Sequence, residues 1–136
     1  MAKAKERPTL ADVMNKRLVA IDAKKTVRQA VALMVREEVG SVLVTTGGRV
    51  VGILTERDVL RAALAEREVF DNHVHAIMSS PLFTLPATES PHRALELMVQ
   101  KGIRRVPVTL RGRVRGFVTQ RDLVKWLLTR PTASMK

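Results

Sequence analysis

The sequence predicts an α/β (α+β) protein made of two tandem copies of one small unit. Three observations support this prediction: an internal repeat, an alternation of helix-like and strand-like apolar patterns within each copy, and an apolar content of 46% without a long apolar run. The 136 residues suffice for one ordinary domain with a buried core.

The internal repeat has a fixed spacing of 64 residues and no gap. Such a register predicts two repeats of the same fold, which we expect over residues 9–64 and 74–129. Residues 65–73 are the expected linker, and residues 1–8 and 130–136 are expected to be loose tails. The matched pairs include Met14/Met78, Ala30/Ala94, Leu33/Leu97, Met34/Met98, Val44/Val108, Gly52/Gly116, Thr55/Thr119 and Asp58/Asp122.

Each copy is expected to begin with a short helix, ending near Met14 or Met78, and then a short strand over residues 18–21 or 82–85. The next helix begins after Thr26 in one copy and after Ser90 in the other, because these hydroxyl residues favour the N-cap position. Pro91 suits the first helical position, and Gly102 suits the helix end.

A hairpin and a last helix complete each copy. The expected strands are 41–45 and 49–54 in the first copy and 106–109 and 114–118 in the second, with glycines at the turns. The last helices begin at Thr55 and Thr119. A single copy would expose one apolar sheet face, so we expect the two copies to pack sheet to sheet about a pseudo-two-fold axis.

Composition limits the function classes. The formal charge is +11, divided as +4 for residues 1–68 (13 Lys/Arg, 9 Asp/Glu) and +7 for residues 69–136 (11 Lys/Arg, 4 Asp/Glu). This excess favours anionic partners, although it also serves solubility. The absence of cysteine excludes disulfides, thiolate metal sites and cysteine nucleophiles. With no signal-like start and no membrane-length apolar run, we expect a cytoplasmic protein without a membrane partner.

The most informative motif is a strand that runs through a threonine into a helix. It occurs as Gly-Ile-Leu-Thr-Glu-Arg-Asp (52–58) and as Gly-Phe-Val-Thr-Gln-Arg-Asp (116–122). One interpretation is a capping box. The other is a ligand site, because a helix N-terminus attracts phosphate and the aspartate carboxylate can accept two hydrogen bonds from a ribose diol.

Together with the strands that precede it, this motif resembles the tandem cystathionine-β-synthase (CBS) repeat, a pair known as a Bateman module. The resemblance covers about residues 9–129, and this chain looks like a small stand-alone member. Departures are small: Leu43 replaces a typical proline in the first repeat, and Val50-Val51 precede its glycine.

The resemblance implies two clefts between the repeats that hold adenosine-containing ligands. Each cleft would join the threonine and aspartate of one repeat to the strand edge of the other, with backbone near Val106 or Val42 contacting the adenine. The implied residues are Thr55, Asp58, Ile103, Arg104, Arg105, Val106, Ser79 and Ser80 for one cleft, and Thr119, Asp122, Val39, Gly40, Ser41, Val42, Lys16 and Arg17 for the other.

The two implied clefts differ in charge. Arg104 and Arg105 are good phosphate donors, whereas the other cleft offers Gly40 and Ser41 at the matching positions. We therefore expect the cleft with Asp58 to bind the more anionic end of a nucleotide.

The function predicted from the sequence is a regulatory module that senses AMP, ADP, ATP, S-adenosylmethionine or a related compound and signals to a separate effector. We expect no catalytic residue, no metal site and no required cofactor, since no nucleophile–base pair stands out and His73-x-His75 lacks a third ligand. The final helices would form a homodimer through Leu60, Ala63, Leu64, Trp126, Leu127 and Leu128.

The alternative is nucleic-acid binding through the basic surface of the second repeat. Its arginines are Arg104, Arg105, Arg111, Arg113 and Arg115, and the last three alternate along the hairpin. Scarce aromatic residues, with no Tyr, three Phe and one Trp, disfavour recognition by base stacking.

Overall fold

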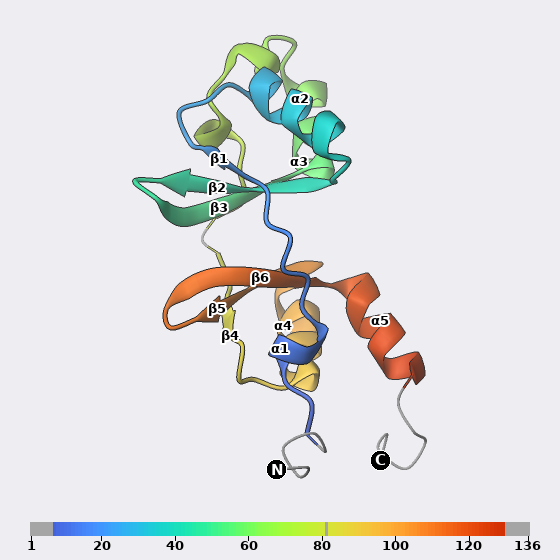
Figure 1. The fold of residues 1–136 in the computed structure, drawn as a ribbon. Helices are drawn as coiled ribbons and strands as arrows, with labels where there is room; N and C mark the ends of the chain where they lie inside the picture. The colour runs from blue at the N-terminus through green and yellow to red at the C-terminus, as the bar shows by residue number, and fades with distance from the viewer. Residues whose placement is uncertain (1–6, 81, 130–136) are drawn as a thin grey trace. The chain divides into compact units, whose positions relative to one another are not determined.

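The computed structural model describes residues 7–80 and 82–129, and within these residues it confirms a mixed α+β fold (Figure 1). The described residues form two three-stranded sheets, β1-β2-β3 and β4-β5-β6, and five α-helices. The expected tails 1–8 and 130–136 lie largely outside the described residues, so their looseness stays a prediction.

The chain divides into two compact units. We call Leu18–Leu82 the central unit, because it is one continuous stretch. We call the combination of Met1–Arg17 and Phe83–Lys136 the split unit, because two stretches far apart in sequence build it.

The central unit has its helices on one face of its sheet (Figure 1). Strand β2 lies in the middle, parallel to β1 and antiparallel to β3. The core lies between sheet and helices and includes Val27, Val44 and Leu54, all fully buried. The elements are β1 (Ala20–Asp22), α2 (Val27–Glu37), β2 (Ser41–Thr46), β3 (Arg49–Thr55) and α3 (Glu56–Ala65).

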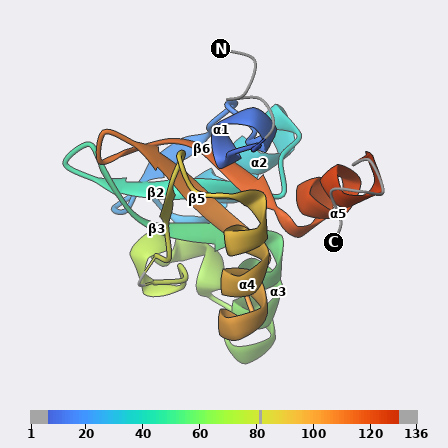
Figure 2. The same cartoon turned by 90° about the horizontal axis from the view of Figure 1, so that it is seen from below.

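The split unit repeats this topology, with β5 in the middle, parallel to β4 and antiparallel to β6. Its elements are α1 (Leu10–Val13), β4 (Leu85–Pro86), α4 (Pro91–Lys101), β5 (Arg105–Leu110), β6 (Arg113–Thr119) and α5 (Gln120–Thr129). Figure 2 shows its hairpin loop and α5 at opposite ends of the sheet.

The N-terminal segment packs with the second repeat rather than with the one it precedes. Leu10 is fully buried in the same core cluster as Val106 and Leu123. Its backbone N–H donates to the carbonyl of Glu89, at 2.8 Å. In the same way Val74, which opens the second repeat in sequence, is fully buried in the core of the central unit. The compact units therefore differ from the repeat boundaries expected from the sequence.

Several expected elements differ in type or length. The helix expected to end near Met78 is a 3-10 turn at Val74–Ala76, because backbone bonds to the carbonyls of Lys25 and Ala23 hold this segment on the central unit. The first strand of each copy is shorter and later than expected, at Ala20–Asp22 and Leu85–Pro86. The expected sheet-to-sheet packing stays a prediction.

The expected helix ends are confirmed. Thr26 Oγ1 accepts from Gln29 N, and Ser90 Oγ accepts from Arg93 N, each at 3.1 Å. Gly102 ends α4 at φ 64°, in the left-handed region that glycine adopts easily. Glu38 takes the corresponding conformation after α2, at φ 56°.

Candidate functional site

The first strand-to-helix motif is a closed hydrogen-bonded capping box. Thr55 has extended backbone and precedes α3. Its hydroxyl accepts from Asp58 N at 3.1 Å, and its backbone N–H donates to Asp58 Oδ2 at 2.9 Å. The side chains of this motif are therefore fixed at the helix N-terminus, where backbone N–H groups attract anions.

The second motif has the same geometry in the split unit. Thr119 Oγ1 accepts from Asp122 N at 3.0 Å, and Thr119 N donates to Asp122 Oδ2 at 2.9 Å. The two copies of the motif therefore share their hydrogen bonds as well as their threonine and aspartate residues.

A close backbone crossing lies beside each motif and depends on its glycine. A Cβ added to Gly52 would lie 2.5 Å from the Met78 sulfur and 3.0 Å from the Ser79 carbonyl oxygen. A Cβ added to Gly116 would lie 2.7 Å from the Met14 sulfur and 2.9 Å from the carbonyl oxygen of Asn15. Any larger residue would therefore displace the crossing segment.

The crossing segments are hydrogen-bonded to the strands. Ser79 exchanges backbone bonds of 2.8 and 3.2 Å with Ile53, and Asn15 exchanges bonds of 2.8 and 3.0 Å with Phe117. Each crossing thereby places one polar residue, Ser79 or Asn15, on the strand that leads into the motif of its own unit.

These two polar side chains make different contacts. Ser79 Oγ donates to Asp58, at 3.1 Å from Oδ1 and 3.3 Å from Oδ2. Asn15 Oδ1 instead accepts from Arg17 N, at 2.8 Å. Asp58 is only 9% exposed, whereas Asp122 is half-buried. Among the described residues, the carboxylate of Asp122 accepts a hydrogen bond from Thr119 N alone. The sequence analysis predicted Ser79 as a site residue but did not include Asn15. The 64-residue spacing of the repeat identifies Asn15 as the counterpart of Ser79.

The strand starts of each unit lie beside the motif of the same unit. Ser41 pairs with Thr55, and the Gly40 carbonyl accepts from Glu56 N at 3.0 Å. Arg105 pairs with Thr119, and the carbonyl of Arg104 accepts from Gln120 N at 2.8 Å. The pairing of each motif with the strand start of the other repeat, as the resemblance implies, stays a prediction.

The backbone expected to contact adenine lies at a partly unpaired strand edge. Strand β4 pairs only with Val108 and Thr109, so the first part of β5 has no strand neighbour on that side among the described residues. The side chains of Val42 and Val106 are buried, and both residues pair with the second strand of their hairpin, opposite Leu54 and Val118. Of the other implied residues, Lys16, Arg17 and Ser80 are exposed, and Ile103 and Val39 are half-buried.

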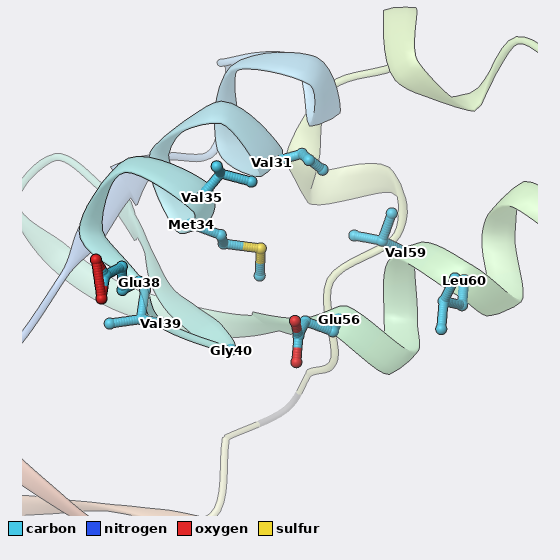
Figure 3. Close-up of a pocket in the computed structure, with 9 residues that line it drawn as sticks. All are labelled: Val31, Met34, Val35, Glu38, Val39, Gly40, Glu56, Val59 and Leu60. Atoms are coloured by element: carbon cyan, nitrogen blue, oxygen red, sulfur yellow. The ribbon is translucent and has the colours of Figure 1, made fainter.

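A hollow of about 500 Å³ opens between α2 and α3 (Figure 3). It contains Val39 and Gly40 of the expected site, but neither Thr55 nor Asp58 lines it. Its wall is mostly apolar and continues to Val35 and Leu60, which are 73% and 68% exposed. The full lining is Val31, Met34, Val35, Glu38, Val39, Gly40, Glu56, Val59 and Leu60.

The apolar residues expected at a dimer interface differ in exposure. Leu60 and Ala63 on α3 are exposed, and Leu64 is 92% exposed. On α5, Leu128 is 80% exposed, whereas Leu127 and Trp126 are half-buried.

The described residues hold neither a metal-type cluster nor a membrane-spanning helix. No group of three or more His, Cys, Asp or Glu side chains that could hold a metal ion occurs there, and the rings of His73 and His75 are 5.5 Å apart. None of the helices within residues 7–80 and 82–129 has the length and apolarity needed to cross a bilayer.

The fold and the duplicated motif define a tandem-repeat α+β protein with two equivalent strand-to-helix sites. The family model of the CBS domain matches residues 10–65 and again residues 74–129. The chain therefore belongs to the CBS-domain family, and the resemblance seen in the sequence is confirmed.

Similar proteins include relatives of different lengths. The CBS domain-containing protein YhcV of Bacillus subtilis is 29% identical over 115 residues, covering 85% of this chain and 82% of that protein. Protein MJ1225 of Methanocaldococcus jannaschii is 28% identical, and the match covers 85% of this chain but only 41% of that protein.

Solved structures are similar to this chain over most of its length. The CBS domain structure NE2398 is 30% identical, with a TM-score of 0.78, covering 85% of this chain and 91% of that chain. The CBS domain pair of protein MJ0100, solved in complex with 5′-methylthioadenosine and S-adenosyl-L-methionine, has a TM-score of 0.79 at 21% identity, covering 96% and 99% of the two chains. At that identity the likeness shows the fold alone.

Proposed function

We propose that this chain is a regulatory module that binds an adenosine-containing ligand at its two strand-to-helix motifs and signals to a separate partner. The observation that carries the proposal is the repeated geometry: both motifs hold a threonine hydroxyl and an aspartate carboxylate at a helix N-terminus beside a strand. The N–H groups there suit a phosphate, and the carboxylate suits a ribose diol.

The competing interpretation, helix capping alone, has a counterpart in the same chain. Thr9 and Asp12 form a capping box at α1, with Thr9 N donating to Asp12 Oδ2 at 2.8 Å. That aspartate is exposed. Asp58, in contrast, is nearly buried and also bonded to Ser79, which is more than capping requires. Asp12 therefore provides a matched control.

AMP, ADP, ATP and S-adenosylmethionine all present the diol and are the proposed ligand class. The structure of MJ0100 with its two adenosine-containing ligands supports this ligand class only through the shared fold. The proposal therefore depends on the residues of this chain. In this proposal the protein performs no catalysis, and a homodimer through the exposed apolar residues of α3 and α5 transmits the change to an effector.

Isothermal titration of the full chain with AMP, ATP and S-adenosylmethionine tests the proposal. We expect binding to at least one of them, and loss of the ribose 2′-hydroxyl should weaken it roughly tenfold, since one hydrogen bond to a charged group contributes about 1.5 kcal/mol. Asp58→Ala should weaken binding more than Asp122→Ala, because it also releases Ser79.

The control is Asp12→Ala, which removes a capping contact without touching either motif. It should bind as the unaltered protein does. Asp58→Asn provides a second variant that removes the negative charge at this position. The amide oxygen of the introduced asparagine can still accept from Thr55 N, so the helix cap is preserved. Absence of heat with all three ligands, in folded protein free of co-purified nucleotide, would leave both motifs as helix caps.

A further inference from the structure

The hairpin between β5 and β6 carries a concentrated positive charge without a balancing acid. Residues 105–119 contain four arginines and no Asp or Glu, whereas the matched residues 41–55 of the first hairpin contain Arg49 alone. Arg111, Arg113 and Arg115 are exposed, and no described ion pair involves them.

These three arginines converge on one hollow. Together with Leu110 they line a depression of about 410 Å³ at the tip of the hairpin. Arg115 lies where the register between β5 and β6 shifts, opposite the step from Val108 to Thr109. Side chains of like charge repel one another around a shared hollow. A bound polyanion would offset this repulsion and stabilise the arrangement.

The backbone at Arg111 gives an independent observation. Its φ is 54°, a left-handed conformation that is unfavourable for residues with a Cβ. The matched residue of the first hairpin is Gly47, at φ 58°, where glycine is relaxed. An arginine thus occupies a position where glycine would be less strained, and strained backbone of this kind is found at ligand-binding sites.

The structure separates this group from the other arginines of the repeat. Arg104 and Arg105 lie at the start of β5 beside Thr119, whereas Arg111 follows its end, roughly 17 Å away along a six-residue strand. Figure 2 shows the hairpin loop at the end of the sheet opposite α5. The tip of the hairpin, which carries Arg111, Arg113 and Arg115, is therefore a surface apart from the Thr119–Asp122 motif.

We propose that Arg111, Arg113 and Arg115 form a binding surface for the phosphate backbone of duplex nucleic acid. The guanidinium groups bind phosphate oxygens, and a two-stranded β-ribbon has the width to enter the major groove. The hairpin strands and turn have no aromatic platform except Phe117, near the far end of β6, so the surface recognises phosphates of a duplex rather than stacked single-strand bases. Binding is independent of base sequence.

The test is fluorescence anisotropy of a labelled 20-base-pair DNA duplex with the full chain, between 50 and 200 mM salt. The variant Arg111→Gly/Arg115→Val gives the second hairpin the residues found in the first. It should weaken binding roughly tenfold or more and lower the salt slope by about 2, since each lost phosphate contact removes about 0.9.

The matched control is Lys24→Gln/Lys25→Gln, which removes two exposed charges from the turn before α2. It should leave the salt slope within experimental error. Equal losses in both variants, or no duplex binding at 50 mM salt, would overturn the proposal. Stronger binding to polyglutamate than to the duplex would also overturn it, because the partner would then be an acidic protein.

The melting temperature supplies a second readout. Arg111→Gly alone should raise it by roughly 3–6 °C, because glycine relieves the backbone strain, while duplex binding falls. A lower melting temperature would assign Arg111 a structural role and contradict the proposal.

Discussion

The two strand-to-helix motifs share their capping contacts but differ in how the aspartate is surrounded. Asp58 in the central unit is 9% exposed and receives a hydrogen bond from Ser79. Asp122 in the split unit is half-buried, and the corresponding Asn15 turns to Arg17 N instead. The cap is thus present in both units, while only the first aspartate accepts a further hydrogen bond, from the serine of its crossing segment.

The difference also concerns how each crossing segment is held. The Met78–Ser79 crossing lies within the continuous central unit, whereas the Met14–Asn15 crossing joins the N-terminal stretch of the split unit to its C-terminal stretch. The same glycine contact therefore stabilises a local connection in one unit and a long-range one in the other.

The largest expected effect tests these crossings. Gly52→Ala and Gly116→Ala should each lower the free energy of unfolding by about 2–3 kcal/mol, because the crossing backbone cannot yield as a side chain can. Urea denaturation measures the loss, with Thr46→Ala on an exposed sheet position as control. Gly116→Ala should also speed trypsin cleavage at Lys16 and Arg17. Unchanged unfolding in both variants would show that the crossings adapt.

The next effect compares the aspartates. Asp58→Ala should cost about 2 kcal/mol of unfolding free energy, because it removes a capping partner and leaves the Ser79 hydroxyl without its acceptor. Asp122→Ala and the control Asp12→Ala should each cost about 0.5–1 kcal/mol, as capping contacts do. Thermal denaturation without ligand measures both. Equal costs at Asp58 and Asp122 would remove the structural difference between the two units.

The smallest effect isolates the serine. Ser79→Ala should cost about 1 kcal/mol, since it deletes one hydrogen bond to a carboxylate but creates no cavity. The neighbouring Ser80→Ala, also exposed and without a described hydrogen bond, should change stability little. If the two alanine variants unfold at the same denaturant concentration, the Ser79–Asp58 bond contributes nothing.

Local signals made much of the fold predictable. The 64-residue register located both copies, and Thr26, Ser90 and Gly102 marked helix ends that the structure confirms. Capping and turn preferences act between residues close in sequence, so they can be read without knowledge of the tertiary fold. The capping contacts of both Thr-x-x-Asp motifs followed from the same local chemistry.

Contacts between distant segments were not predictable in this way. Nothing local to Val74 distinguishes a 3-10 turn from a helix; its bonds to the loop after β1 decide it. Likewise Asn15 has no motif around it, and its place beside Phe117 arises only when the N-terminal segment crosses the sheet of the split unit.

The sequence by itself determined the duplication, the order of most elements, the helix caps and the family, because these depend on spacing and on local backbone preferences. Only the tertiary structure decided that Leu10 completes the core of the split unit, that Ser79 donates to Asp58 while Asn15 accepts from Arg17 N, and that three arginines share one hollow. These features depend on which distant segments pack together, and burial of apolar surface across the whole chain selects that packing.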